Sequence, residues 1–151
     1  MEVIKTPVTR EDGEVVGLMG TFTDITFRRR TEEALDRERD LLRALLETVP
    51  DRVYFKDRQS RFIRCSDELA RFHGKQSPAE LIGKTDFDFF PPSEADFFVA
   101  KDRETLRNQR MVDIPEEPIR TAHGERWLHT RKVPVVDERG EPRYLVGISH
   151  D

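Results

Sequence analysis

The sequence predicts an α+β protein: a β-hairpin, a long helix, and then a domain in which two strands, several helices and three strands follow one another. Three observations support this prediction. Strand–turn–strand patterns occur near both ends of the chain, a charged leucine-rich segment without Gly or Pro fills residues 25–49, and helix-start signals cluster between residues 66 and 96. The 151 residues suffice for one ordinary domain with an extension.

Composition and charge limit the class of protein. The 26 basic and 30 acidic residues give a net charge of −4, and 37% of the residues are charged. No apolar run approaches the roughly 18 residues of a membrane helix and no signal-peptide core opens the chain, so we expect a soluble, cytoplasmic protein. The basic run Arg28–Arg30 precedes Glu32 and Glu33 at helical spacing, which favours a solvated helix face over a nucleic-acid contact. The single Cys65 excludes an intrachain disulfide and a thiolate zinc site.

An internal repeat is the strongest signal in the chain. Residues 5–24 align without a gap with residues 132–151, at an offset of 127, and nine of the 20 positions are identical. Each copy carries a glycine, Gly13 or Gly140, among charged residues, which predicts the turn of a β-hairpin. Because an isolated hairpin is marginal in water, we expect the first copy to lie against a neighbouring molecule or this chain's own domain.

The repeat divides the chain into three parts. We interpret residues 1–24 as the closing hairpin of a preceding unit, residues 25–49 as a connector helix and residues 50–151 as a complete domain. The connector has an apolar stripe, which indicates either a helix covering a sheet or a short coiled coil, and we expect it to dimerise or dock through that stripe. The stripe includes Leu35, Leu42, Leu46 and Val49.

Helix and strand signals also order the complete domain. Ser66 begins a short helix, Ser77 and Glu80 form a capping box, and Pro92 opens a long helix that ends near Arg110. We expect this long helix to pack across the sheet. Strands are predicted at residues 51–57, 61–66, 112–121, 125–137 and 142–149.

Three segments carry a family resemblance. They read LLETVPDRVYFKD, LIGKTDFDFFPPSEADFF and HGERWLHTRKVPVVDERGEPRYLVGISHD. In these segments the chain resembles a PAS domain, the sensor module of many bacterial histidine kinases and cyclic-di-GMP enzymes. The resemblance implies a five-stranded antiparallel sheet with helices on one face. Asp24, Ile25 and Thr26 match the D-I-T element that joins a PAS core to its output helix, which implies a signal-transmission role for them and for the repeated Asp151.

Aromatic residues mark the expected core. Five phenylalanines between residues 87 and 98 either line a pocket for a flat ligand or fill it, and we favour filling. We expect a small apolar cavity without an Arg or His cluster, so any ligand would be largely apolar or aromatic. The expected lining residues are Phe62, Phe90, Phe98, Leu106, Trp127 and Ile148.

The cofactor is not identified by the sequence. Cys65 lacks the surrounding motif of flavin-adduct light sensors, which favours an inert thiol. The long helix holds no His, so His73 and His129 are the remaining candidates for haem ligands, and ordinary histidines are favoured. Asp102 lies near an apolar stripe, where a carboxylate needs a partner, and we expect a backbone group or an Arg to bond it, with a ligand contact as the alternative.

Together these observations predict a sensory module of a multidomain signalling protein. It would bind a small ligand or a partner and relay the change through its flanking helices, as a homodimer next to further PAS and output domains. The alternative is a ligand-free dimerisation or spacer module with a filled core. No nucleophile–base pair or catalytic carboxylate pair is evident, so we expect no catalysis by this segment and place enzymatic activity in a parent histidine kinase or cyclic-di-GMP enzyme.

Overall fold

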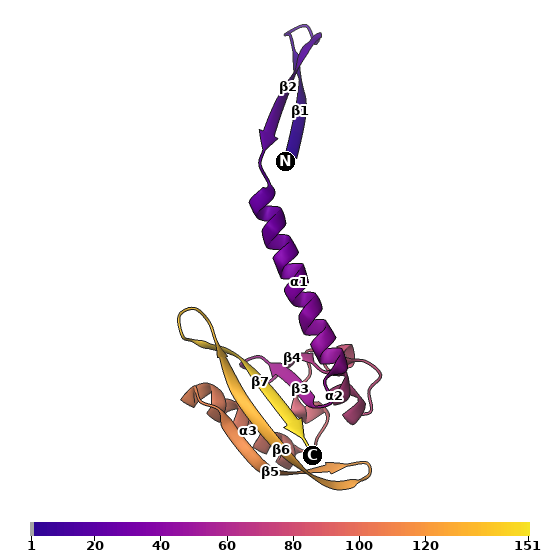
Figure 1. Ribbon diagram of the computed structural model, residues 1–151, viewed down its shortest axis with the longest axis vertical. Helices are drawn as coiled ribbons and strands as arrows, with labels where there is room; N and C mark the ends of the chain where they lie inside the picture. Colours follow the sequence, from indigo (N-terminus) through magenta and orange to yellow (C-terminus); the bar gives the residue numbers. More distant parts are fainter. Residues whose placement is uncertain (1) are drawn as a thin grey trace. The chain divides into compact units, whose positions relative to one another are not determined.

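The computed structural model describes residues 2–151, which form two compact units (Figure 1). The first unit ends at Leu42, and the second spans Arg43–Asp151. Every helix within residues 2–151 is too short or too charged to cross a lipid bilayer.

The first unit begins with the predicted hairpin. Strand β1 (Glu2–Thr9) pairs in antiparallel register with β2 (Val15–Thr23), and all residues of both strands are exposed. The turn is closed by the amide of Gly13, which donates to the Arg10 carbonyl at 2.9 Å, and by the Arg10 amide, which donates to Glu14 at 2.8 Å. Gly13 has a φ of 87°, a left-handed conformation that glycine adopts without strain.

Helix α1 (Thr26–Thr48) follows and runs across the boundary between the units. It contains no Gly or Pro, and Asp24 caps its start by accepting hydrogen bonds from the Thr26 amide at 2.9 Å and the Thr26 hydroxyl at 2.6 Å. Its apolar stripe is covered unevenly. Leu46 is buried, Leu42 is half-buried and Leu35 is exposed.

The second unit is built on a five-stranded antiparallel sheet, which confirms the predicted fold class. The strand order is β4–β3–β7–β6–β5, so the first and last strands of the unit pair at the centre (Figure 1). The elements are β3 (Arg52–Lys56), β4 (Phe62–Cys65), α2 (Asp67–Phe72), the 3₁₀ turns η1 (Pro78–Glu80) and η2 (Asp86–Asp88), α3 (Pro92–Asn108), β5 (Val112–Thr121), β6 (Gly124–Val136) and β7 (Pro142–His150).

Helix α3 packs on one face of the sheet, where it contacts β5, β6 and β7. Side chains alternate along a strand, so β6 turns Leu128, Thr130 and Lys132 toward the covered face and leaves Trp127 and Arg131 on the other. The long helix therefore lies across the sheet as predicted, and it decides which face of each strand becomes the core.

Gly147 in β7 is closely covered by a side chain of the neighbouring strand. A methyl group at this position would overlap the ring of Tyr54, which lies on the β7 backbone from the neighbouring strand β3. Glycine is therefore required here by close approach, and the Tyr54 ring forms part of the floor of the core.

Candidate functional site

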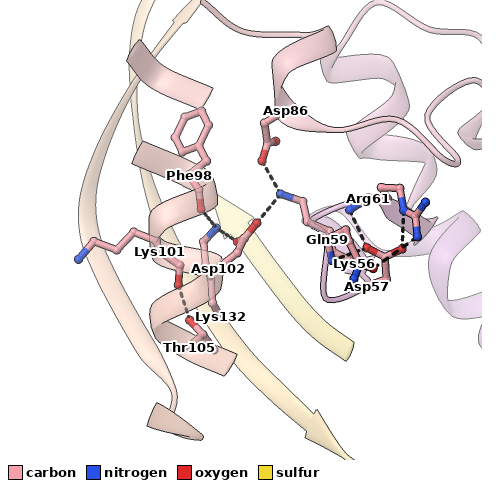
Figure 2. Close-up of polar contacts among 10 residues, drawn as sticks. All are labelled: Lys56, Asp57, Gln59, Arg61, Asp86, Phe98, Lys101, Asp102, Thr105 and Lys132. Carbon is pink, nitrogen blue, oxygen red and sulfur yellow. Dashed lines mark hydrogen bonds and ion pairs between the residues drawn. The ribbon is translucent and has the colours of Figure 1, made fainter. Parts of the chain in front are cut away.

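The core of the second unit contains three buried ion pairs, two of which share the carboxylate of Asp102. Lys56 ends strand β3, Asp86 begins η2, Asp102 lies in the middle of α3 and Lys132 lies in β6. Each is at most 4% exposed. Four elements far apart in the sequence thus place two ammonium groups and two carboxylates inside the protein (Figure 2).

Asp102 lies between the two lysines (Figure 2). Lys56 Nζ donates to Asp102 Oδ2 at 3.0 Å and to Asp86 Oδ2 at 2.5 Å. Lys132 Nζ donates to Asp102 Oδ1 and to the carbonyl oxygen of Phe98, the latter at 3.4 Å. Both oxygens of Asp102 are therefore occupied, and the formal charges of the four groups cancel.

The pKa values follow from this geometry. Burial alone would lower the pKa of Lys56, but the carboxylates of Asp102 and Asp86 raise it above its ordinary value. Burial alone would raise the pKa of Asp102, but the ammonium groups of Lys132 and Lys56 hold it below its ordinary value. Lys56 and Asp102 therefore both stay ionised at neutral pH, because the opposite charges around each group compensate its desolvation.

A cavity of about 50 Å³ adjoins this network. Its polar wall includes Lys56, Asp86, Lys132 and Glu117. Burial raises the pKa of Glu117, although the Thr130 hydroxyl and the charge of Lys132 oppose the shift. The apolar wall consists of Tyr54, Phe62, Leu69, Phe72, Phe90, Phe98, Ile119 and Leu128.

Three of the six residues expected at the cavity are found there. Phe62, Phe90 and Phe98 line it. Trp127 is 58% and Ile148 is 39% exposed, because both alternate onto the sheet face opposite α3. Leu106 is half-buried on α3 and does not line the cavity, because the helix turns Phe98, Asp102 and Thr105 toward the sheet instead.

The expectation of an apolar cavity without cationic groups was wrong. Lys56 and Lys132 line the cavity, and Arg52 and His73 lie at its wall as well. Asp102 is bonded by lysines, not by the Arg or backbone group that we expected. One feature of the sequence pointed to Lys132 as a core residue. Lys132 is identical to Lys5 in the internal repeat, and it falls on the same strand face as Leu128.

Two histidines that the sequence singled out have ordinary protein partners. His73 follows α2, with its ring 4.7 Å from that of Phe89 and 5.3 Å from that of Phe90. Burial and the charges of nearby cations lower the pKa of His73 to about 4, so the ring is neutral at pH 7. His129 lies on β6, where its Nε2 is 2.6 Å from a carboxylate oxygen of Asp113.

Cys65 does not line the cavity itself and is buried behind its wall, in one cluster with Leu69, Ala70 and Leu81. Burial raises the pKa of its thiol to about 11, so the nucleophilic thiolate is scarce at neutral pH. Within residues 2–151, no three His, Cys, Asp or Glu side chains are grouped so that they could hold a metal ion.

Of the residues expected to transmit a signal, Asp24 and Asp151 occupy equivalent positions of the repeat. Asp24 caps α1 through Thr26, and Ile25 between them is half-buried. Asp151, which follows β7, forms ion pairs with the side chains of Arg52 and Arg126. Arg52 also lines the cavity, so Asp151 is in direct contact with the cavity wall.

Comparison with known proteins gives the family. The sequence profile of the family described as "PAS fold" matches residues 46–151. An uncharacterised protein, y4lL of Sinorhizobium fredii, is 34% identical over 111 residues, covering 72% of this chain and 13% of that protein. The methanogenesis regulatory histidine kinase FilI of Methanothrix harundinacea is 29% identical over 110 residues, covering 72% and 12%. The chain thus spans about an eighth of the length of these relatives.

Solved structures share the fold at low sequence identity. VqmA bound to DPO has a TM-score of 0.64 at 22% identity, covering 72% of this chain and 55% of that one. The PAS domain of the quorum-sensing receptor RpfR of Cronobacter turicensis, in complex with BDSF, has a TM-score of 0.56 at 21% identity, covering 70% and 96%.

Proposed function

The chain belongs to the PAS family, and on this premise we propose that it is a non-catalytic sensory module of a larger signalling protein. A small polar molecule binds in the core cavity beside Lys56 and Lys132, and the resulting change passes to the flanking helices. The similarity to the histidine kinase FilI supports a signalling context. A cytoplasmic location is part of this proposal.

The observation that carries the proposal is the ion network at the cavity wall. Taking charged groups out of water is expensive, and replacing a buried ion pair with well-packed apolar residues is often neutral or stabilising. A module that served only as a spacer would be at least as stable with an apolar core. Lys56, Lys132, Asp86 and Glu117 instead line the cavity with hydrogen-bonding groups, which suits recognition of a polar molecule.

The volume of the cavity limits the ligand. About 50 Å³ is room for about four water molecules at the ~10–15 Å³ that each requires. A ligand larger than a few heavy atoms would therefore have to displace side chains such as Phe90. VqmA bound to DPO and the RpfR PAS domain in complex with BDSF share this fold, and each holds a bound ligand, which supports the same use here.

A thermal-shift screen with small polar molecules tests the proposal. The variant Asp102→Leu/Lys132→Met puts apolar side chains of similar size in place of Asp102 and Lys132 and leaves Lys56 with Asp86. Arg103→Gln on the exposed side of α3 is the matched control. We expect a hit to raise the melting temperature of the wild type and of the control but not of the core variant. If no molecule raises the melting temperature of the wild type, and native mass spectrometry detects no retained small molecule, the ligand-free spacer alternative holds.

We also propose that residues 1–24 close a preceding unit of the same fold. The pairing in β1–β2 repeats that in β6–β7 at an offset of 127: Lys5 opposes Gly20 as Lys132 opposes Gly147. Both hairpins also shift register at the equivalent point beside the turn. Such agreement in register supports a shared fold more strongly than the identities do.

The equivalence predicts what covers the exposed hairpin. Lys5 takes the position of the buried Lys132, so a preceding domain would supply a carboxylate to it. The test is amine acetylation of Lys5 in this chain and in a longer natural polypeptide that includes the preceding residues. Lys5 should react in the first and be as protected as Lys132 in the second, whereas equal reactivity in both would contradict the assignment.

Helix α1 is proposed as the link that dimerises and moves. Its exposed leucines, with Leu35 at 63% exposure, would form a homodimer seam. Asp24 ties the start of α1 to the end of β2, so a change in that strand would be passed directly to the helix.

A further inference from the structure

A second recess in the Arg43–Asp151 unit lies between α2 and the turn that joins β5 to β6, and it shares Arg52, Phe72 and His73 with the wall of the core cavity. We propose that this recess binds the anionic group of a small organic molecule, a carboxylate or a phosphate, through Arg52, Arg71 and Arg126. The proposal rests on the proposed function, because it names the ligand class of the same sensory region.

The recess has the size and charge for such a ligand. Its volume is about 480 Å³, and four arginines line it, namely Arg52, Arg71, Arg120 and Arg126. Glu68 is the one carboxylate among the described lining residues. This excess of cations gives the recess a positive potential that attracts anions.

Neighbouring carboxylates compensate these cations only in part. Glu68 lies 3.1 Å from Arg71, and Glu94 lies 3.9 Å from Arg120, whose side chain is mostly exposed. Arg52 and Arg126 share a single carboxylate, that of Asp151. The charges of Asp51 and Glu68 also act on Arg52. The described lining itself nevertheless holds four guanidinium groups and one carboxylate, and Asp151 is shared by two of the arginines.

Arg52 is the residue that most needs a further partner. It is only 6% exposed, and its Nε is buried without a hydrogen-bond acceptor. Burial lowers the pKa of Arg52, and the like charge of Arg126 lowers it further. An unsatisfied buried donor is costly, and the planar guanidinium matches carboxylate and phosphate oxygens with two parallel hydrogen bonds. An anion at the junction of recess and cavity would lie between the guanidinium groups of Arg52 and Arg126 and offset the two positive charges.

Aromatic rings complete the recess and define the rest of the ligand. The guanidinium of Arg52 lies 4.6 Å and that of Arg126 5.9 Å from the ring centre of Phe72. Phe89 and Phe90 flank His73 on the same side. A flat or unsaturated group can pack on these rings while its anionic end meets the arginines, so the favoured ligand combines one oxyanion with a planar apolar part.

NMR titration of the chain tests this, with benzoate and phenyl phosphate as organic anions, inorganic phosphate as the bare anion and benzamide as the neutral analogue. We expect both organic anions to bind more tightly than benzamide, with an affinity that falls as salt is added. Binding should also raise the pKa of His73, because an anion offsets the cations that now depress it. Comparing benzoate with phenyl phosphate shows which oxyanion is preferred.

Variants separate this site from general attraction to a charged surface. Arg71→Gln and Arg126→Gln should each weaken benzoate binding by about tenfold or more, the effect of losing one charged hydrogen bond. Arg103→Gln is the control and should bind benzoate as the wild type does. Arg71→Gln and Arg126→Gln keep the test independent of the buried Arg52, whose replacement would also affect folding. Equal binding of benzoate and benzamide, or unchanged binding in both variants, would overturn the inference.

The result is distinguishable from a failure of the proposed function. If small polar molecules raise the melting temperature of the wild type but not that of Asp102→Leu/Lys132→Met, and no anion binds, then the inference about the recess is wrong and the sensory proposal stands. If the anions bind as expected and no molecule acts through the core, the recess is an anion site and the sensory proposal for the cavity is wrong.

Discussion

Replacing Asp102 with leucine should be among the most destabilising single substitutions in the core. The carboxylate bonds both Lys56 and Lys132, and all three residues are 1% exposed. Without it, Lys56 keeps Asp86 at 2.5 Å, but Lys132 keeps only the Phe98 carbonyl at 3.4 Å. Breaking a buried ion pair from one side costs about 3–5 kcal/mol, a large part of the ~5–15 kcal/mol by which a domain is stable.

Comparing the single variant with a double variant isolates the cause. Removing both charges with Asp102→Leu/Lys132→Met leaves no unpaired ammonium, so the double variant should regain most of the lost stability. Urea unfolding followed by far-UV circular dichroism measures both free energies of unfolding. The reasoning would be refuted by a loss below about 1 kcal/mol for Asp102→Leu, or by a double variant no more stable than the single one.

The same network predicts a pH dependence. The pKa of Asp102 is lowered on folding, so its contribution to stability is complete above the ordinary value of 3.8 and is lost as the pH falls through the lower, folded value. The pKa of Lys56 is raised, so its contribution is complete below 10.5 and is lost as the pH rises through the higher, folded value. Between pH 2 and 4, the free energy of unfolding should therefore fall more steeply in the wild type than in Asp102→Leu/Lys132→Met. Parallel curves would contradict this.

Further substitutions test the packing and the connector helix. Gly147→Ala forces a methyl group into the Tyr54 ring and should lower the free energy of unfolding by ~1–3 kcal/mol or more. Gly17→Ala in β2 meets open space and should not lower it. Equal denaturation midpoints for the two variants would contradict this. Leu46→Glu buries a charge at a position that is 5% exposed and should lower the melting temperature by several degrees. Leu35→Glu, at an exposed position, should leave the melting temperature unchanged but halve the mass of the proposed dimer in sedimentation. A Leu35 variant that keeps its mass would remove that residue from the dimer seam.

Local sequence signals predicted the elements of this fold well, because the contacts that form them are local. The capping box expected at Ser77 is present, with Glu80 accepting hydrogen bonds from the amides of Gln76 and Ser77. The segment nevertheless makes only one 3₁₀ turn, since Gly83 soon turns the chain with a φ of 83°. Capping chemistry fixes where a helix starts, and the following residues decide how far it continues.

The interior of the candidate site could not be predicted in the same way. Alternation assigns Trp127 and Leu128 to opposite faces of β6, but both are apolar, and only the position of α3 decides which face is covered. Charged residues such as Lys56 are assigned to the surface by default, because a buried ammonium needs partners that are distant in sequence. Asp86 and Asp102, 30 and 46 residues away, supply those partners.

The two adjoining sites differ in the kind of recognition they offer. In the core, two ammonium groups meet two carboxylates and both oxygens of Asp102 are occupied, so the cavity presents directed hydrogen bonds and no net charge from this network. The recess is lined by four guanidinium groups and one carboxylate, that of Glu68, and a buried donor of Arg52 has no acceptor among the described residues. A neutral polar molecule therefore suits the cavity, and an anionic end suits the recess. Because Arg52 belongs to both walls and pairs with Asp151 beyond the last strand, an anion bound there competes with Asp151 for the same guanidinium, which would couple ligand binding to the end of β7.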